Sequence, residues 1–329
     1  NAGDAGSGLT GDADDFSKQT AMDAIRLIFD YNPLTIELLY AKIDENITTS
    51  GDDALTDDVD LYGINSTYEL GDDLNTQVEA YFFAQIDKTT NTNAAASGTK
   101  SDTIYIPGLR ASADVLDGLN IQGEVAWQRG TDASPASDAN NQRREAFAAQ
   151  FISNYQIPND ILPDVLEEYN PALGYSYTYV SGDSNPTNQT GNGNALSSEA
   201  SAEVNTAWNQ MYENQGGKTI YNALFDLTNL QIHTISLTAN PIEDVTTTLS
   251  WHGLWLDKEL DEAVPTNSVV LNTVDGVGGT ADANLNETSL GYEIDVDTIY
   301  DYTEDVQIGA SVGWFVPGDV FASNNDQVA

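Results

Sequence analysis

The stretch ETSLGYEIDVDTIYDY, residues 287–302, alternates apolar and polar residues almost without interruption. Leu290, Tyr292 and Ile294 fall on one parity, and Glu293 and Asp295 fall on the other. A period of two is that of a β-strand with one apolar and one polar face. Residues 303–305 separate this stretch from VQIGASVGW, residues 306–314, which alternates in the same way. The whole stretch therefore predicts a long antiparallel hairpin.

The same alternation recurs along the chain and predicts about twelve strands. They span residues 22–31, 34–46, 58–70, 75–88, 103–116, 119–130, 144–157, 169–182, 224–240, 245–257, 287–302 and 306–316. Short turns alternate with long loops rich in Asn, Asp, Ser, Thr and Gly. The predicted long loops are residues 47–57, 89–102, 131–143, 183–223 and 258–286. Tight turns at one end and long loops at the other are typical of an outer-membrane barrel.

The longest of these loops, residues 183–223, has two interpretations. Loops of this length are usually functional or disordered. The loop either folds into the barrel mouth as a constriction or shields the rim. Residues 197–212 carry Ala, Glu and Trp at helical spacing, which predicts a short helix.

Alternation alone does not decide which face of the strands is buried. In a soluble sandwich or barrel the apolar face forms the core, whereas in a membrane barrel it faces lipid. The predicted strands exceed the ~5–6 residues usual in soluble proteins, and Tyr, Trp and Phe gather near strand ends as in interface girdles. The opposite face carries many Gln, Asn, Glu and Arg residues, which suit a wet lumen. These features favour an all-β, antiparallel transmembrane β-barrel surrounded by the lipid of a bacterial outer membrane.

Composition narrows the function. The chain has 329 residues, 11 Lys and Arg, 52 Asp and Glu, and a net charge of -41. Nucleic acid is excluded as a partner because phosphate binding needs clustered basic residues. The acids chiefly favour solubility, although those of loop 258–286 are also candidates for weak calcium binding. Cysteine is absent, neither histidine has metal-ligand spacing, and no catalytic motif is present, so we expect no enzyme activity, no metal site and no cofactor.

Charged residues on the polar parity are candidates to line a pore. They are Arg26, Glu37, Glu79, Arg110, Asp114, Glu124, Arg144, Glu293, Asp295 and Asp297. The arginines either form a selectivity constriction or pair with wall carboxylates. The last three acids lie about 7 Å apart on one strand face. They either filter cations or line a hydrated wall.

Several short segments follow one another in a characteristic order. They are DAIRL at 23–27, YAKI at 40–43, DLYG at 60–63, EAYF at 79–82, GLR at 108–110, GEVAWQ at 123–128, GYSY at 174–177, LGYEID at 290–295 and FVPG at 315–318. Together they resemble the alginate export family of outer-membrane barrels over nearly the whole chain. The resemblance implies a monomeric barrel of about eighteen strands, an even number as in other single-chain bacterial barrels. Residues 1–329 would then be a single, partial barrel domain with strands missing at both ends.

The best-known members of that family export alginate, a polyuronate, through a lumen rich in Arg and Lys. Here carboxylates outnumber arginines among the candidate pore residues. Because rings of charge set selectivity in a narrow pore, we expect a passive channel for a hydrophilic solute that prefers cations or neutral molecules. The alternatives are a polysaccharide exporter, a structural barrel and an acidic β-rich adhesin.

Overall fold

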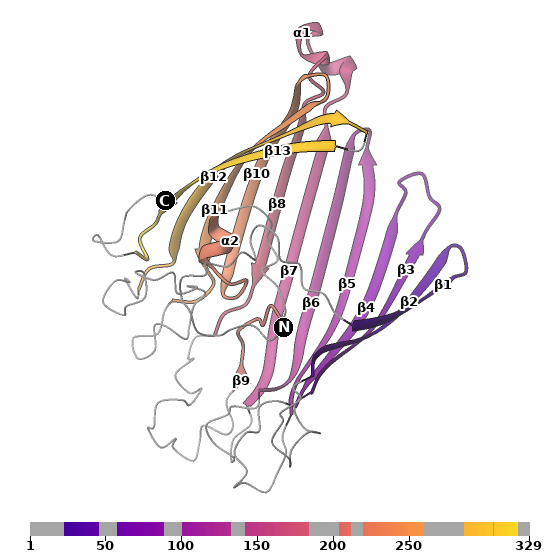
Figure 1. Ribbon diagram of the computed structural model, residues 1–329, viewed down its shortest axis with the longest axis vertical. Helices are drawn as coiled ribbons and strands as arrows, with labels where there is room; N and C mark the ends of the chain where they lie inside the picture. The colour runs from indigo at the N-terminus through magenta and orange to yellow at the C-terminus, as the bar shows by residue number, and fades with distance from the viewer. Residues whose placement is uncertain are drawn as a thin grey trace, which may run out of the picture.

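The computed structural model describes residues 23–45, 58–88, 101–132, 142–183, 204–211, 220–259, 286–304 and 306–321. The long strands are β1 (Asp23–Asp30), β2 (Leu34–Glu45), β3 (Asp58–Glu69), β4 (Gln77–Asp87), β5 (Asp102–Leu116), β6 (Leu119–Asp132), β7 (Gln142–Gln156), β8 (Ala172–Val180), β10 (Leu230–Ile242), β11 (Val245–Leu256), β12 (Ser289–Thr303) and β13 (Val306–Pro317). They form one curved antiparallel sheet in which each strand pairs with its neighbours along the chain (Figure 1). The short β9 (Val204–Asn205) lies off this path and pairs in parallel with β7. The sheet is not closed, and β1 and β13 form its edges.

The predicted strands are confirmed, with one large error in their bounds. The sequence predicts that the ninth strand begins at residue 224, but β10 begins at Leu230, because residue 224 ends a short helix, α2 (Ile220–Leu224), and residues 225–229 are irregular. The helix predicted within residues 197–212 is wrong for its described part, since residues 204–211 contain β9 followed by irregular backbone. The rest of that prediction lies outside the described residues. No helix in the described ranges is long and apolar enough to cross a membrane.

The two ends of the sheet differ as the sequence predicts. Short turns lie at one end, together with α1 (Asp164–Glu167) and a short 3-10 helix, η2 (Asn159–Ile161), and the strand ends that flank the predicted long loops lie at the other end (Figure 1). In the β5–β6 turn Gly118 has a φ of 75°, which only glycine adopts without cost. Of the predicted long loops, the greater part lies outside the described residues.

The β3–β4 turn is closed by one carboxylate. Asp72 accepts hydrogen bonds from the backbone N–H of Thr76 at 2.8 Å and from its hydroxyl at 2.7 Å. Both bonds favour the charged form, so they lower the pKa of Asp72 below its ordinary value.

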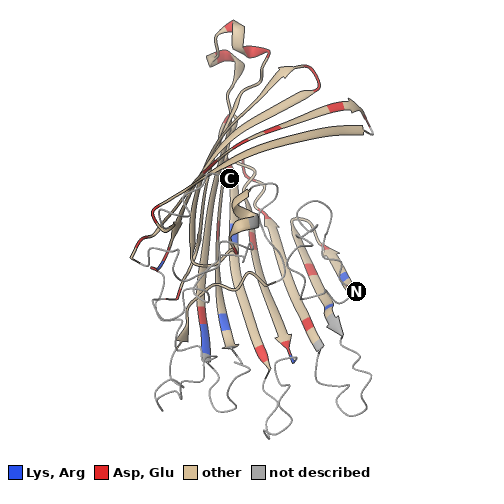
Figure 2. Cartoon of the chain, turned by 60° about the vertical axis from the view of Figure 1, so that its left-hand side comes forward, with Lys and Arg blue, Asp and Glu red and all other residues tan. Residues whose placement is uncertain are grey.

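The two faces of the sheet show the reverse of soluble-protein burial. On β12, Ile294 and Val296 are 43% and 42% exposed, whereas Glu293 and Asp295 are 0% and 5% exposed. Rows of large exposed apolar side chains continue on the other strands, and such rows are rare on soluble monomers. The apolar face is therefore the lipid-facing surface, and the polar face is the barrel interior. Figure 2 shows that acidic residues are spread over both ends of the sheet and that basic residues are few.

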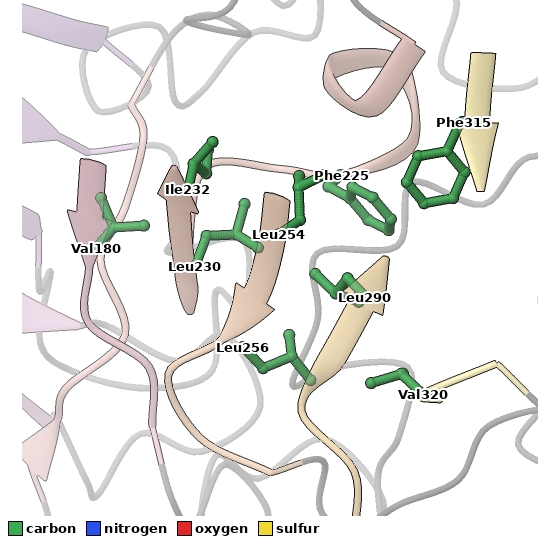
Figure 3. Packing of buried hydrophobic residues seen from close by; sticks show 9 residues of the cluster. All are labelled: Val180, Phe225, Leu230, Ile232, Leu254, Leu256, Leu290, Phe315 and Val320. Carbon is green, nitrogen blue, oxygen red and sulfur yellow. The ribbon is translucent and has the colours of Figure 1, made fainter. Parts of the chain in front are cut away.

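An apolar cluster occupies the interior near the loop end of β8 and β10–β13 (Figure 3). Its members are Val180, Phe225, Leu230, Ile232, Leu254, Leu256, Leu290, Phe315 and Val320. The alternation in the sequence predicts that Leu290 lies on the lipid-facing side of β12, and this prediction is wrong. The strand bulges at Gly291, whose φ is 120°, and the β11–β12 register shifts between Leu254 and Trp255. The bulge reverses the parity of Leu290 and turns its side chain inward.

Candidate functional site

The polar face of the sheet is the candidate functional site. The register places the predicted pore residues on this face, from Arg26 on β1 to Asp297 on β12. The fold thus brings them to one surface, although they are divided among separate groups along it. A pore-lining role for them stays a prediction.

The largest group centres on Arg110 of β5. In the sheet register Arg110 lies between Glu79 of β4 and Glu124 of β6. Its Nη1 lies 3.8 Å from Glu79 Oε2, and its Nη2 donates a hydrogen bond to Gln122 Oε1 at 2.7 Å. The hydroxyl of Tyr81 donates to Glu124 Oε1 at 2.5 Å. The row therefore alternates acceptor, donor and acceptor groups across three strands.

Asp114 lies on the same strand closer to the turn end. Its two carboxylate oxygens accept hydrogen bonds from the side-chain amides of Asn120, at 2.8 Å, and Asn75, at 2.9 Å. Gln122 in turn donates to Asn120 at 3.0 Å. A continuous hydrogen-bonded chain thus connects this carboxylate to the Arg110 group.

The other two candidate arginines also pair with carboxylates. Arg26 Nη2 lies 2.5 Å from Glu37 Oε1, in an exposed pair near the β1 edge. Arg144 Nη2 lies 3.6 Å from Asp102 Oδ2, and the Arg144 side chain is 6% exposed. The three arginines lie on β1, β5 and β7, and each pairs with its own carboxylate. They therefore do not form one continuous basic row across the sheet. The geometry favours the pairing alternative over a basic constriction.

Two described segments lie against the interior face of the sheet. They belong to the predicted loop 183–223 and to the residues that follow it. We call residues 204–211 and 220–229 the inner loop. The backbone of Asn209 in the inner loop makes two hydrogen bonds with the buried side chain of Gln128. The N–H of Asn209 donates to Gln128 Oε1 at 2.9 Å, and Gln128 Nε2 donates to the C=O of Asn209 at 2.7 Å. Farther along, the N–H groups of Ile220 and Tyr221 donate to the two oxygens of Glu293 at 2.6 Å and 2.7 Å. The described residues of the loop therefore lie on the interior face of the sheet, and a role as a constriction stays a prediction.

This arrangement gives the three acids of β12 different environments. Glu293 is fully buried beneath α2 and caps its first backbone N–H groups. Oδ2 of Asp295 lies 3.1 Å from Nε2 of His252, and Nδ1 of the same histidine lies 2.8 Å from the hydroxyl of Thr234. Asp297 accepts a hydrogen bond from Ser311. Among the described residues no group of three possible ligands is placed to hold a metal ion.

A cavity of about 460 Å³ lies between the inner loop and β4–β8. The Arg110 group forms part of its wall, and Trp208 and Met211 of the inner loop form another part. The sequence marks Trp208 and Met211 only as an apolar patch within a long loop. No periodic pattern links this patch to the strands that it contacts.

The alginate export family model matches residues 43–329 of the chain. The chain belongs to the alginate export family. This confirms the resemblance seen in the sequence. It assigns the chain to the β-barrels of the bacterial outer membrane.

No curated protein matches the sequence. Among solved structures, the siderophore receptor PiuA from Acinetobacter baumannii is 10% identical with a TM-score of 0.38, over 93% of this chain and 49% of the receptor. A mutant of the ferric enterobactin receptor PfeA from Pseudomonas aeruginosa is 8% identical with a TM-score of 0.35, over 89% of this chain and 48% of the receptor. The chain spans about half the length of these receptors.

Proposed function

We propose that this member of the alginate export family is a passive outer-membrane channel for hydrophilic solutes and prefers cations or neutral molecules to anions. The observation that carries the proposal is the pairing of Arg26, Arg110 and Arg144 with wall carboxylates. A paired guanidinium presents little net positive field to a passing anion. Glu124 and Asp297 add negative charge to the same face.

A second candidate function is export of an acidic polysaccharide. It is favoured by the family to which the chain belongs, which is described by alginate export. This function requires net positive charge along the solute path. The two candidates therefore differ in the sign of the selectivity.

Reversal potentials in a salt gradient across a planar bilayer separate the two. We expect a cation preference that decreases in the double variant Glu79→Gln/Glu124→Gln and increases in Arg110→Gln. Asp164→Asn/Glu167→Gln is the matched control, because it also removes two negative charges, from α1 at the tip of a turn. We expect it to leave the reversal potential nearly unchanged.

Two results would overturn the proposal. An anion preference that disappears when Arg26, Arg110 and Arg144 are neutralised would establish the export function instead. Folded protein that inserts into the bilayer without conducting would exclude a passive channel.

A further inference from the structure

The cavity between the inner loop and the sheet has the size and lining of a small-molecule site. Its volume of about 460 Å³ falls within the ~300–1,000 Å³ usual for ligand pockets, which combine apolar walls with a few placed polar groups. Trp208 lines it from the inner loop, and Phe83 and Ile106 line it from the sheet. The backbone N–H of Trp208 donates to the carbonyl of Ser181 at 2.9 Å, which fixes the loop at this point. The apolar part of the cavity is therefore held in place by backbone structure.

On the same sheet face as Phe83 and Ile106, four polar side chains form one row across β4–β7. Glu79, Arg110, Glu124 and Gln150 are successive partners in the register of these strands, and all line the cavity. A carboxylate accepts hydrogen bonds, a guanidinium carries five N–H donors, and an amide does both. The described contacts of Arg110 engage Nη1 and Nη2 with one partner each. The row thus retains capacity for groups that both donate and accept.

Adjacent hydroxyl groups on a sugar ring have this dual character. The C–H face of a sugar is apolar and packs against aromatic rings, as apolar surfaces do. A cavity lined both by an aromatic side chain and by a row of carboxylate, guanidinium and amide groups is complementary to both properties. The charge of the row also discriminates between sugars, because two carboxylates against one guanidinium repel an anionic ligand.

We propose that this cavity binds a neutral saccharide unit, with Trp208 as the aromatic platform and Arg110, Glu124 and Gln150 as hydrogen-bonding partners of its hydroxyls. The inference rests on the proposed channel function and narrows its solute class. It excludes a uronate as the preferred ligand of this site.

Equilibrium binding to the purified protein in detergent micelles tests the site without requiring conduction. The probes are three trisaccharides that differ in charge: neutral maltotriose, anionic trigalacturonate and the cationic trimer of glucosamine. Calorimetry should give a higher affinity for maltotriose than for trigalacturonate, because the net negative row repels the anionic trisaccharide; the glucosamine trimer measures the attraction of the same row for a cationic sugar. Because a hydrogen bond to a charged group is lost, Arg110→Gln should weaken maltotriose binding about tenfold.

Trp208→Phe should also weaken maltotriose binding severalfold and remove the change in tryptophan emission on titration. Trp127→Phe is the matched control: it is the same substitution on the lipid-facing side of β6, where Trp127 is 37% exposed. It should bind maltotriose as the unsubstituted protein does. Heat-modifiable gel mobility would verify that each variant is folded.

Absence of maltotriose binding, or unchanged binding in folded Trp208→Phe, would overturn the inference. Binding of trigalacturonate as tight as that of maltotriose would overturn the exclusion of a uronate, and binding of the glucosamine trimer alone would overturn the neutral ligand class. If cation-preferring conductance persists while saccharide binding is absent, the saccharide site fails and the channel function stands. If the protein binds maltotriose but does not conduct, the saccharide site stands and the channel function fails.

Discussion

Replacing Glu293 with glutamine should release α2 from the barrel wall. The two carboxylate oxygens accept the N–H groups of Ile220 and Tyr221 at 2.6 Å and 2.7 Å, and the Glu293 side chain is 0% exposed. In Glu293→Gln one carbonyl oxygen keeps one of these bonds. The second oxygen becomes an amide NH₂ that points a donor at a donor. The variant therefore loses one bond and gains a buried mismatch.

The size of the effect follows from the charge on the acceptor. A hydrogen bond to a charged group contributes about 1.5–3 kcal/mol, and an unsatisfied buried donor costs a similar amount. We expect docking of α2 to weaken by about 2–3 kcal/mol, which is about a 30- to 150-fold increase in the opening equilibrium. Amide hydrogen exchange reports such local opening directly.

The measurement is exchange mass spectrometry on peptides covering residues 220–224 in detergent micelles. Asp297→Asn is the matched control, because it removes one carboxylate from the same strand face without touching α2; Asp297 contacts Ser311 instead. We expect faster exchange at Ile220 and Tyr221 in Glu293→Gln alone. Unchanged exchange there, or equal acceleration in the control, would refute the assignment of Glu293 as the anchor of α2.

Three further predictions address the lipid face, the inner loop and a turn. Val312 is 71% exposed on the lipid face, so Val312→Arg should destabilise the folded barrel by about 2–4 kcal/mol if the site lies near the midplane. Ser311→Arg, on the interior face, should fold normally. Equal heat-modifiable gel mobility of the two variants in lipid vesicles would contradict this assignment of faces. Gln128→Ala leaves the N–H and C=O of Asn209 without their partner, at about 1–3 kcal/mol per group, so exchange at Asn209 should accelerate; unchanged protection would show that other contacts hold the inner loop. The lowered pKa of Asp72 means that its turn contacts are present above the unfolded pKa of about 3.9 and are lost as pH falls through the lower folded value. Amide protection in the turn, taken relative to the intrinsic exchange rate at each pH, should therefore fall as pH falls through this window, and should stay constant in Asp72→Ala; a constant protection in the unsubstituted protein would contradict the role of this carboxylate.

The wall of the barrel is predictable from the sequence because a strand repeats every two residues. A lipid-facing residue and an interior residue must alternate, so each long strand carries its own signal. The exceptions have local causes. Leu290 breaks the parity because one added residue at a bulge reverses every side chain before it, and no polar–apolar pattern marks such a bulge in advance.

The interior beyond the wall is not predictable in the same way. Two alternatives stay open for the loop 183–223 at the level of sequence, because the choice depends on contacts between residues far apart in the chain. Asn209 bonds to Gln128, 81 positions away, and Ile220 bonds to Glu293, 73 positions away. Neither pairing has a spacing rule. For that reason the strand pattern groups Glu293 with its neighbours as a possible cation filter, although Glu293 anchors a helix.

The central claim is that the apolar face of the sheet meets lipid and the polar face is the barrel interior. Its most direct test is a nitroxide scan of consecutive positions on β4. The chain contains no cysteine, so single cysteines at positions 77–82 can be labelled one at a time. Burial alternates along this strand, with Val78, Ala80 and Phe82 exposed and the intervening residues partly covered. In lipid vesicles, labels at 78, 80 and 82 should be relaxed by dissolved oxygen, and labels at 77, 79 and 81 by a water-soluble nickel complex. Relaxation by the nickel complex at 78, 80 and 82, with protection at the other three positions, would contradict a barrel whose apolar face meets lipid.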